Sequence, residues 1–225
     1  MNKIYSINHF NFIDKIIVSK RQEMCDVINQ ELNNENFIDA LDIGSTNDVE
    51  NESSNYLIKN LKNVSNYKCI SDQKIDDIFF SKTLNKSITE EFSKDQVQSM
   101  KSDIVISNAT IEHVGSIDKQ KKMIENILLL TKKYFIITTP NRYHPIDFHT
   151  KLPLIHWLPK NIHRKILKMF KLNFFSEEEN LNLLSKNELK NLLIQAGANN
   201  FTIFDISLLG FKSNYIVIGL ANQDS

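Results

Sequence analysis

The sequence predicts an α/β fold built on a mostly parallel sheet with an antiparallel hairpin at its C-terminal edge. Short β-branched runs alternate with amphipathic stretches along most of the chain, which is typical of parallel strands joined by helices. The last two apolar runs, 201–210 and 214–221, are separated only by a short turn at 211–213, which indicates a hairpin. The 225 residues are enough for one substantial core.

The N-terminal half is predicted to hold short strands separated by helical stretches. Apolar residues at helical spacing before Leu32 indicate an amphipathic helix, and the run FIDALDIG indicates a buried strand that Gly44 stops. The elements expected in this half are a helix at 14–32, a strand at 37–43, a helix at 56–63, a strand at 67–71, a helical turn at 76–80 and a strand at 87–93.

The C-terminal half carries stronger signals. In SKNELKNLLIQAGA, Ser185 and Glu188 have the spacing of a capping box, and Gly197 is placed to end the helix. The run KYFIITTP is a buried strand that stops at Pro140. The elements expected here are a strand around 104–106, a helix at 118–131, a strand at 133–140, a helix at 185–196 and the two strands of the hairpin.

The composition is that of a globular protein and excludes several classes. Hydrophobic residues make up 41% and charged residues 24%, a balance too apolar for a disordered chain. Lys+Arg and Asp+Glu both number 27, so no net charge favours nucleic acid as a partner. Cys25 and Cys69 lack CxxC spacing, which argues against a disulfide scaffold. Because the sequence shows neither a signal peptide nor an apolar run of membrane-spanning length, we expect a cytoplasmic protein.

Ligands of parallel sheets bind beyond the carboxyl ends of the strands, so the polar residues there are the candidates for a site. After the first strand, LDIGSTND offers one glycine where a dinucleotide fold needs GxGxxG, which favours a ligand without phosphates. A plain strand-to-helix turn is the alternative interpretation of Gly44. Asp72, which follows the second strand, can accept hydrogen bonds from both hydroxyls of a ribose or can cap a helix.

The segment DIVISNATIEHV resembles one found in the seven-stranded S-adenosylmethionine-dependent methyltransferases. That family combines an acidic-x-Gly turn after its first strand with a D-(apolar)-S/N-x-x-(apolar)-E-H segment at its fourth. The stretch TPNRYHPIDFHT…HWLP is similar to one in a bacterial subgroup of these enzymes, and the resemblance extends over about 37–220. It implies a Rossmann-like, seven-stranded sheet with helices on both faces, and S-adenosylmethionine as the cofactor.

The resemblance also implies roles for individual residues. It places Asp42 and Gly44 at the amino acid end of the cofactor and Asp72 at its ribose. His113, at the carboxyl edge of the sheet, is a candidate general base, although a hydrogen bond to Glu112 or to the backbone is an alternative role. The cofactor-binding residues that the resemblance implies are Asp42, Gly44, Ser45, Thr46, Asp72, Ser107 and Asn108.

The stretch from Thr138 to Pro159 contains all four prolines, the only tryptophan and three of the six histidines. Its histidines suggest zinc, but Pro153 breaks any shared helical face and no HExxH or CxxC motif is present, so no metal is expected. We favour a stiffened lid over an acceptor pocket. The substrate-site candidates are Asn141, Arg142, His144, Asp147, His149 and Trp157.

The region that follows, 160–171, combines five cations with an apolar stripe. Such a helix either rests on an anionic membrane or lies on the protein surface with its lysines in water, so peripheral membrane contact is one of two interpretations. The five cations are Lys160, Arg164, Lys165, Lys168 and Lys171.

The function expected from these observations is methyl transfer from S-adenosylmethionine to an oxygen or nitrogen of a small-molecule or lipid- or sugar-precursor acceptor. No nucleic acid is expected as a partner. Residues 1–36 are expected to form a helical lead-in and 37–225 the methyltransferase domain, with 141–184 as a substrate-side insertion. A catalytically inactive S-adenosylmethionine-binding subunit is the alternative, and the missing GxGxxG disfavours an NAD-dependent oxidoreductase.

Overall fold

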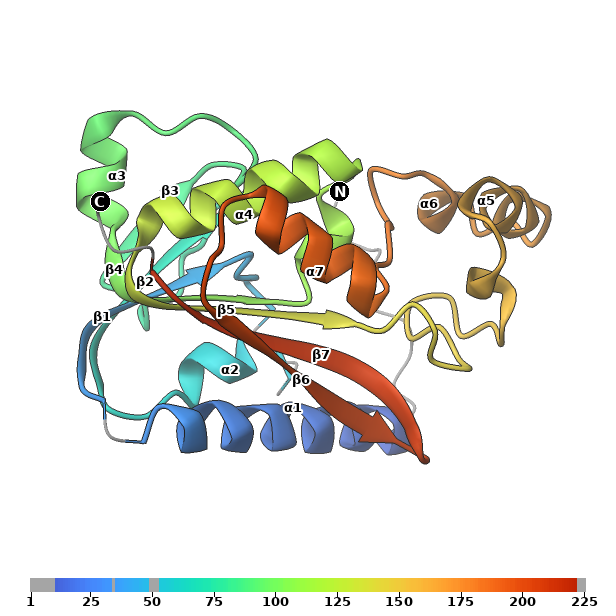
Figure 1. The fold of residues 1–225 in the computed structure, drawn as a ribbon, viewed down its shortest axis with the longest axis horizontal. Helices are drawn as coiled ribbons and strands as arrows, with labels where there is room; N and C mark the ends of the chain where they lie inside the picture. Colours follow the sequence, from blue (N-terminus) through green and yellow to red (C-terminus); the bar gives the residue numbers. More distant parts are fainter. Residues whose placement is uncertain (1–10, 34, 49–52, 222–225) are drawn as a thin grey trace.

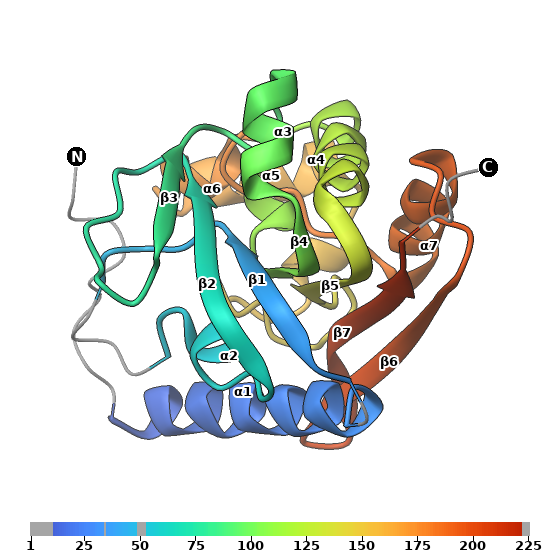
Figure 2. The same ribbon diagram turned by 90° about the vertical axis from the view of Figure 1, so that its left-hand side faces the viewer.

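The computed structural model describes residues 11–33, 35–48 and 53–221. Their centre is a seven-stranded sheet of order β3-β2-β1-β4-β5-β7-β6, which lies between helices above and below it in Figure 1 and again in Figure 2. All pairs are parallel except those of β7, which runs antiparallel to β5 and β6, so the predicted fold class is confirmed. The strands are β1 (Phe37–Ile43), β2 (Val64–Ser71), β3 (Lys82–Asn85), β4 (Ser102–Asn108), β5 (Thr131–Pro140), β6 (Phe201–Leu208) and β7 (Phe211–Leu220).

Helices cover both faces of the sheet because successive side chains of its central strands point to opposite sides. On β1, Leu41 and Ile43 belong to one apolar cluster and Ala40 to the other. The first cluster packs under α4 and α7, and the second under α1 and α2, as Figure 2 shows. The helices are α1 (Asn11–Glu31), α2 (Tyr56–Lys59), α3 (Lys94–Met100), α4 (Ile117–Leu130), α5 (Lys160–Met169), α6 (Asn173–Ser176) and α7 (Lys186–Gln195), with short 3-10 turns η1 (Ile111–His113) and η2 (Ile155–Trp157).

Several predicted elements are confirmed with their end signals. The Ser185 hydroxyl accepts a hydrogen bond from the Glu188 backbone N–H, while the Glu188 carboxylate accepts one from the Ser185 N–H, which is the predicted capping box of α7. Helices α1 and α4 lie where the apolar spacing placed them. The hairpin turn falls at Leu209 and Gly210, both with positive φ, instead of at 211–213. The division at residue 36 remains a prediction, since α1 contributes Met24 and Ile28 to the core.

The expected strand at 87–93 is wrong. The third strand is β3, and the side chains of Ser87 and Thr89 hold the following chain in a turn by hydrogen bonding to each other and to the Thr89 backbone N–H. Such local side-chain bonds compete with strand pairing. Ser93 and Gln96 then form a capping box that begins α3, a signal that predicts this helix but was missed. The expected helical turn at 76–80 is a simple turn, and α2 ends at Lys59, short of residue 63.

The segment 141–184 leaves the sheet after β5 and extends to the right in Figure 1, where it carries η2, α5 and α6. Three of the five cations of the 160–171 region are paired with glutamates: Arg164 with Glu178, Lys168 with Glu177, and Lys160 with Glu188. Met169 and Phe170 remain exposed at its end. Contact of this region with a membrane remains a prediction. None of the helices in the described ranges is long and apolar enough to cross one.

Candidate functional site

The carboxyl ends of β1, β2 and β4 meet at one edge of the sheet. Ile43 is paired with Ile70 on one side and with Ser107 on the other, so the residues that follow these strands lie next to one another. Because the sequence predicts a cofactor at this place, we call the turns after β1 (42–48) and β2 (71–77), together with Ser107 and Asn108, the cofactor edge.

The turn after β1 is held by its own buried polar groups. The Ser45 hydroxyl donates to the Asp42 carboxylate, and both side chains are buried. Burial raises the pKa of Asp42 to about 6, against the opposing effect of the Ser45 hydrogen bond. Gly44 has a φ of +90°, which disfavours any other residue, and a Cβ there would lie 2.8 Å from Cγ2 of Thr110. The bare side of Gly44 thus accommodates Thr110, whereas the sequence suggested space for a ligand.

The turns after β1 and β2 are bonded to each other. The Ser71 hydroxyl donates to the Ser45 carbonyl oxygen at 2.8 Å, and the Asn47 side chain accepts a hydrogen bond from the Asp76 N–H. Thr46 is engaged within its own loop, since its N–H donates to the Asn55 side chain. Asp72 lies directly after β2 and is exposed. Its carboxylate is therefore accessible at the predicted position, and its role remains a prediction.

The end of β4 supplies a buried hydroxyl and a sharp change of direction. Ser107 is fully buried, and its Oγ has no hydrogen-bond partner within the described ranges. The Asn108 side chain accepts a hydrogen bond from the Thr138 hydroxyl at 2.6 Å. Ala109 then takes a φ of +51°, a strained conformation for a residue with a Cβ. This bend leads into η1, which carries Glu112 and His113.

Glu112 is the most deeply buried acid of the site, with 0% of its surface exposed. Its Oε2 accepts a hydrogen bond from the Thr139 hydroxyl at 3.0 Å. Its Oε1 has no hydrogen-bond partner in the part of the chain that the structure describes. Arg21 of α1 interacts with it electrostatically, although burial lowers the pKa of this guanidinium. The sequence indicated Glu112 only as a possible hydrogen-bond partner of His113 and gave Arg21 no role in the site.

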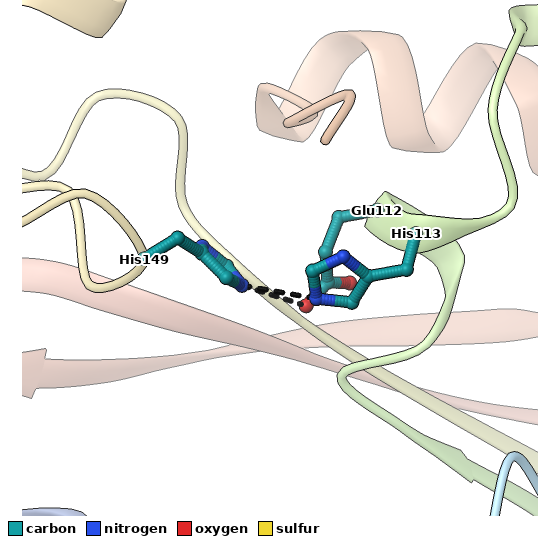
Figure 3. Close-up of side chains that lie close together, drawn as sticks. All are labelled: Glu112, His113 and His149. Carbon is teal, nitrogen blue, oxygen red and sulfur yellow. Dashed lines mark hydrogen bonds and ion pairs between the residues drawn. The ribbon is translucent and has the colours of Figure 1, made fainter. Parts of the chain in front are cut away.

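His113 and His149 point at each other, as Figure 3 shows. Their Nε2 atoms are 3.1 Å apart, and Nε2 of His149 is 3.9 Å from Oε1 of Glu112. Nδ1 of His113 lies 2.7 Å from the carbonyl oxygen of Asn180, to which it donates. Burial lowers the pKa of His113, and Glu112 opposes this effect. We call Glu112, His113 and His149 the histidine cluster.

Asp147 holds the ring of His149. Its Oδ1 lies 3.3 Å from Nδ1 of His149 and accepts a hydrogen bond from the His149 N–H, while its Oδ2 accepts one from the Thr150 hydroxyl at 2.6 Å. Although burial alone would raise the pKa of Asp147, these bonds from His149 and Thr150 lower it well below its ordinary value. The carboxylate therefore stays ionised and fixes the orientation of the imidazole.

The other four predicted substrate residues have structural partners within the segment 141–184 or in the neighbouring α7 and β7, or lie on the surface. Asn141 donates from its side chain to the Lys212 carbonyl oxygen. Arg142 donates to the carbonyl oxygens of His156 and Leu158 and pairs with Glu188. His144 is buried and stacks on Phe148. Trp157 remains 44% exposed. Of the six candidates, the structure brings Asp147 and His149 to His113, and any contact of the other four with a substrate remains a prediction.

The comparisons with known proteins identify the fold. No protein-family model and no curated sequence matches the chain. Magnesium protoporphyrin IX methyltransferase from Synechocystis PCC 6803, crystallised with SAH, aligns over 98% of this chain and 92% of its own, with a TM-score of 0.57 and 14% identity. The chain has the class I methyltransferase fold.

Two further solved structures with this fold are of proteins named as N-methyltransferases. The 1,6-didemethyltoxoflavin-N1-methyltransferase from Burkholderia thailandensis, with bound 1,6-didemethyltoxoflavin and S-adenosylhomocysteine, aligns over 91% of this chain and 79% of its own, with a TM-score of 0.57 and 9% identity. The N-methyltransferase NodS from Bradyrhizobium japonicum WM9 aligns over 91% and 98%, with a TM-score of 0.51 and 6% identity. At these identities the likeness concerns the fold, and the activity has to be argued from the site.

Proposed function

We propose that the chain transfers the methyl group of S-adenosylmethionine to an oxygen or nitrogen of a small-molecule acceptor. The observation that carries this proposal is the fold, since solved structures that share it over most of the chain hold this cofactor or its demethylated product. The polar residues at the carboxyl edge support it, because ligands of such sheets bind there. The lid 141–184, which follows β5, would enclose the acceptor.

The cofactor edge offers groups that fit this cofactor. The buried Ser107 hydroxyl, unpartnered in the described ranges, is available to a ligand, and the exposed Asp72 carboxylate is available to ribose hydroxyls. When bound, S-adenosylmethionine supplies a methyl group on a sulfonium and leaves as S-adenosylhomocysteine. The residues that we propose to hold it are Asp42, Gly44, Ser45, Thr46, Asp72, Ser107 and Asn108.

The histidine cluster lies on the acceptor side in this proposal. In methyl transfer the acceptor's lone pair forms the bond to the methyl carbon as the carbon–sulfur bond breaks, and the acceptor loses its proton. Since Nδ1 of His113 donates to Asn180, its Nε2 carries the lone pair that can take a proton. Asp147 orients His149 beside it. His113 and His149 are therefore placed to hold the acceptor's reacting atom.

Two measurements on the full chain test the proposal. Calorimetric titration with S-adenosylhomocysteine should give one binding site, and incubation with methyl-labelled donor and a small-molecule extract should move label into an extract compound. Binding without transfer would favour an inactive cofactor-binding subunit. If S-adenosylhomocysteine does not bind and a nicotinamide dinucleotide raises the melting temperature instead, the proposal is wrong.

A further inference from the structure

We propose that Glu112, His113 and His149 bind one divalent transition-metal ion. Each residue offers one ligand atom, and these atoms all lie within 4.8 Å of one another (Figure 3). Two ligands come from η1 and the third from the lid, 36 residues further along the chain. The metal site follows from this geometry alone, and only its role in catalysis rests on the proposed function.

The hydrogen bonds of the two rings leave their inner nitrogens as lone pairs. A carbonyl oxygen only accepts, so Nδ1 of His113 carries the hydrogen that it donates to Asn180. Nδ1 of His149 faces the Asp147 carboxylate, which likewise only accepts when ionised. Each neutral ring then presents an unprotonated Nε2, and these two atoms are 3.1 Å apart. Two lone pairs repel at that distance unless a proton or a cation lies between them.

Glu112 favours a cation over a single shared proton. Its carboxylate is completely buried, and Oε1 has no hydrogen-bond partner in the described ranges. A buried carboxylate oxygen without a donor is unfavourable, and one proton between the rings does not reach it. Oε1 lies 3.9 Å from Nε2 of His149, on the side where the two nitrogens converge. An ion at this point would be bound by all three atoms at once.

The ligand set selects the kind of ion. Two imidazole nitrogens and one carboxylate oxygen suit zinc and its first-row neighbours, whereas magnesium and calcium take oxygen ligands. Metal–ligand bonds of about 2.0–2.1 Å in a tetrahedron put ligand atoms about 3.3 Å apart. The separations of 3.1 and 3.9 Å lie near that value, and side-chain rotation would have to bring the remaining pair, which lies within 4.8 Å, to it.

Each ligand also has a second partner that fixes its orientation, as is usual around bound metals. The Asn180 carbonyl oxygen holds His113, Asp147 holds His149, and the Thr139 hydroxyl holds Glu112. Three protein ligands leave an open coordination position. In the proposed methyltransferase this position would bind the acceptor's oxygen or nitrogen and lower its pKa, so that the acceptor would lose its proton to solvent water.

A metal ion at this site changes two expectations from the sequence. His113 becomes a metal ligand instead of the proton acceptor, and a metal is used where none was expected. It also narrows the acceptor to a compound with an ionisable heteroatom that can coordinate the ion, such as a hydroxyl or a phenol.

The test is metal binding by the tag-free full chain after removal of metals with a chelator. Titration with Zn²⁺ and with Co²⁺ should give one equivalent, and Co²⁺ should show the strong visible absorption of a site with four or five ligands. His149→Ala and Glu112→Gln should each weaken binding at least about 10-fold, since each removes one of three ligands. His163→Gln is the matched control, because it removes a histidine of the lid outside the cluster and should leave the affinity unchanged. Thermal unfolding checks that all variants fold.

Two results would overturn the inference: no binding of either ion by the chelator-treated chain, or equal affinity in the wild type and His149→Ala. Titration with S-adenosylhomocysteine on the same samples separates this failure from that of the proposed function. Metal binding without S-adenosylhomocysteine binding would contradict the proposed function and leave the metal site standing. Binding of S-adenosylhomocysteine by a chain that binds neither metal ion would contradict the metal site and leave the proposed function standing.

Discussion

The cofactor edge and the histidine cluster lie at the same end of the sheet but are held together differently. The turn after β1 is shaped mainly by bonds between near neighbours, such as Ser45 to Asp42 and Thr46 to Asn55, and is joined to the turn after β2 through Ser71. In the histidine cluster the contacts span long stretches of chain: His113 to His149 over 36 residues and His113 to Asn180 over 67. The cofactor edge therefore depends on backbone conformation, whereas the cluster depends on how the lid folds back over η1. Substitutions should affect the two regions independently.

The largest effect is expected from His149→Ala. It removes one half of the facing histidine pair, so methyl transfer to the extract compound should fall about 100-fold, as when a group that acts on the acceptor is lost. The affinity for S-adenosylhomocysteine should stay within about 2-fold, because the cofactor edge is built without His149. Scintillation counting and calorimetry measure the two quantities. If methyl transfer and the affinity for S-adenosylhomocysteine fell by similar factors, the cofactor edge and the histidine cluster would not be independent.

Gly44→Ala tests how tightly the cofactor edge is built. The φ of +90° and the contact with Thr110 should together lower the free energy of unfolding by about 2 kcal/mol or more. In a Thr110→Ala background the same change should cost less free energy, because the two nearest atoms of the Thr110 side chain are gone, while the contact with its Cβ at 3.2 Å and the backbone strain remain. Urea unfolding of the four proteins measures both costs. If Gly44→Ala lowered the free energy of unfolding equally in the two backgrounds, Thr110 would not pack against Gly44 as described.

Asp72→Ala should weaken S-adenosylhomocysteine binding by about 10-fold without changing the melting temperature, because the carboxylate is exposed and proposed to hold the ribose. Asp76→Ala is the matched control, since Asp76 lies in the same turn and its carboxylate forms an exposed ion pair with Lys74. Calorimetric titration of both variants measures their affinity for S-adenosylhomocysteine. If the two bind alike, Asp72 has no role in the site.

The smallest effect is a pH dependence of the free energy of unfolding that arises from protonation of Asp42. Its pKa is raised from 3.8 to about 6 in the folded chain, so the folded chain binds the proton more tightly than the unfolded chain does. The stability of the wild type relative to Asp42→Asn should therefore rise as the pH falls through 6 and level off below 3.8. Between about pH 7.5 and about pH 5 the gain should be about 1.4 kcal/mol. Urea unfolding at both values checks this, and a constant difference would contradict the buried state of Asp42.

The same contrast explains which features the sequence could predict. The strands of the sheet other than β3, the C-terminal hairpin and the capping box of α7 depend on apolar runs and on neighbouring residues, and they are confirmed. The strand expected at 87–93 failed because Ser87 and Thr89 form a local turn that apolar spacing does not reveal. Which histidine of the lid meets His113 depends on tertiary packing, so His149 could not be distinguished in sequence from His144 or His156.

The central claim is that a nucleoside cofactor binds at the cofactor edge, beside the histidine cluster. A crystal structure of the chain with S-adenosylhomocysteine tests it most directly. We expect the ribose hydroxyls at the carboxylate of Asp72, the amino acid end near Ser107, and the sulfur facing His113 and His149. A ligand bound elsewhere, with the turns after β1 and β2 closed by their own side chains, would contradict the claim.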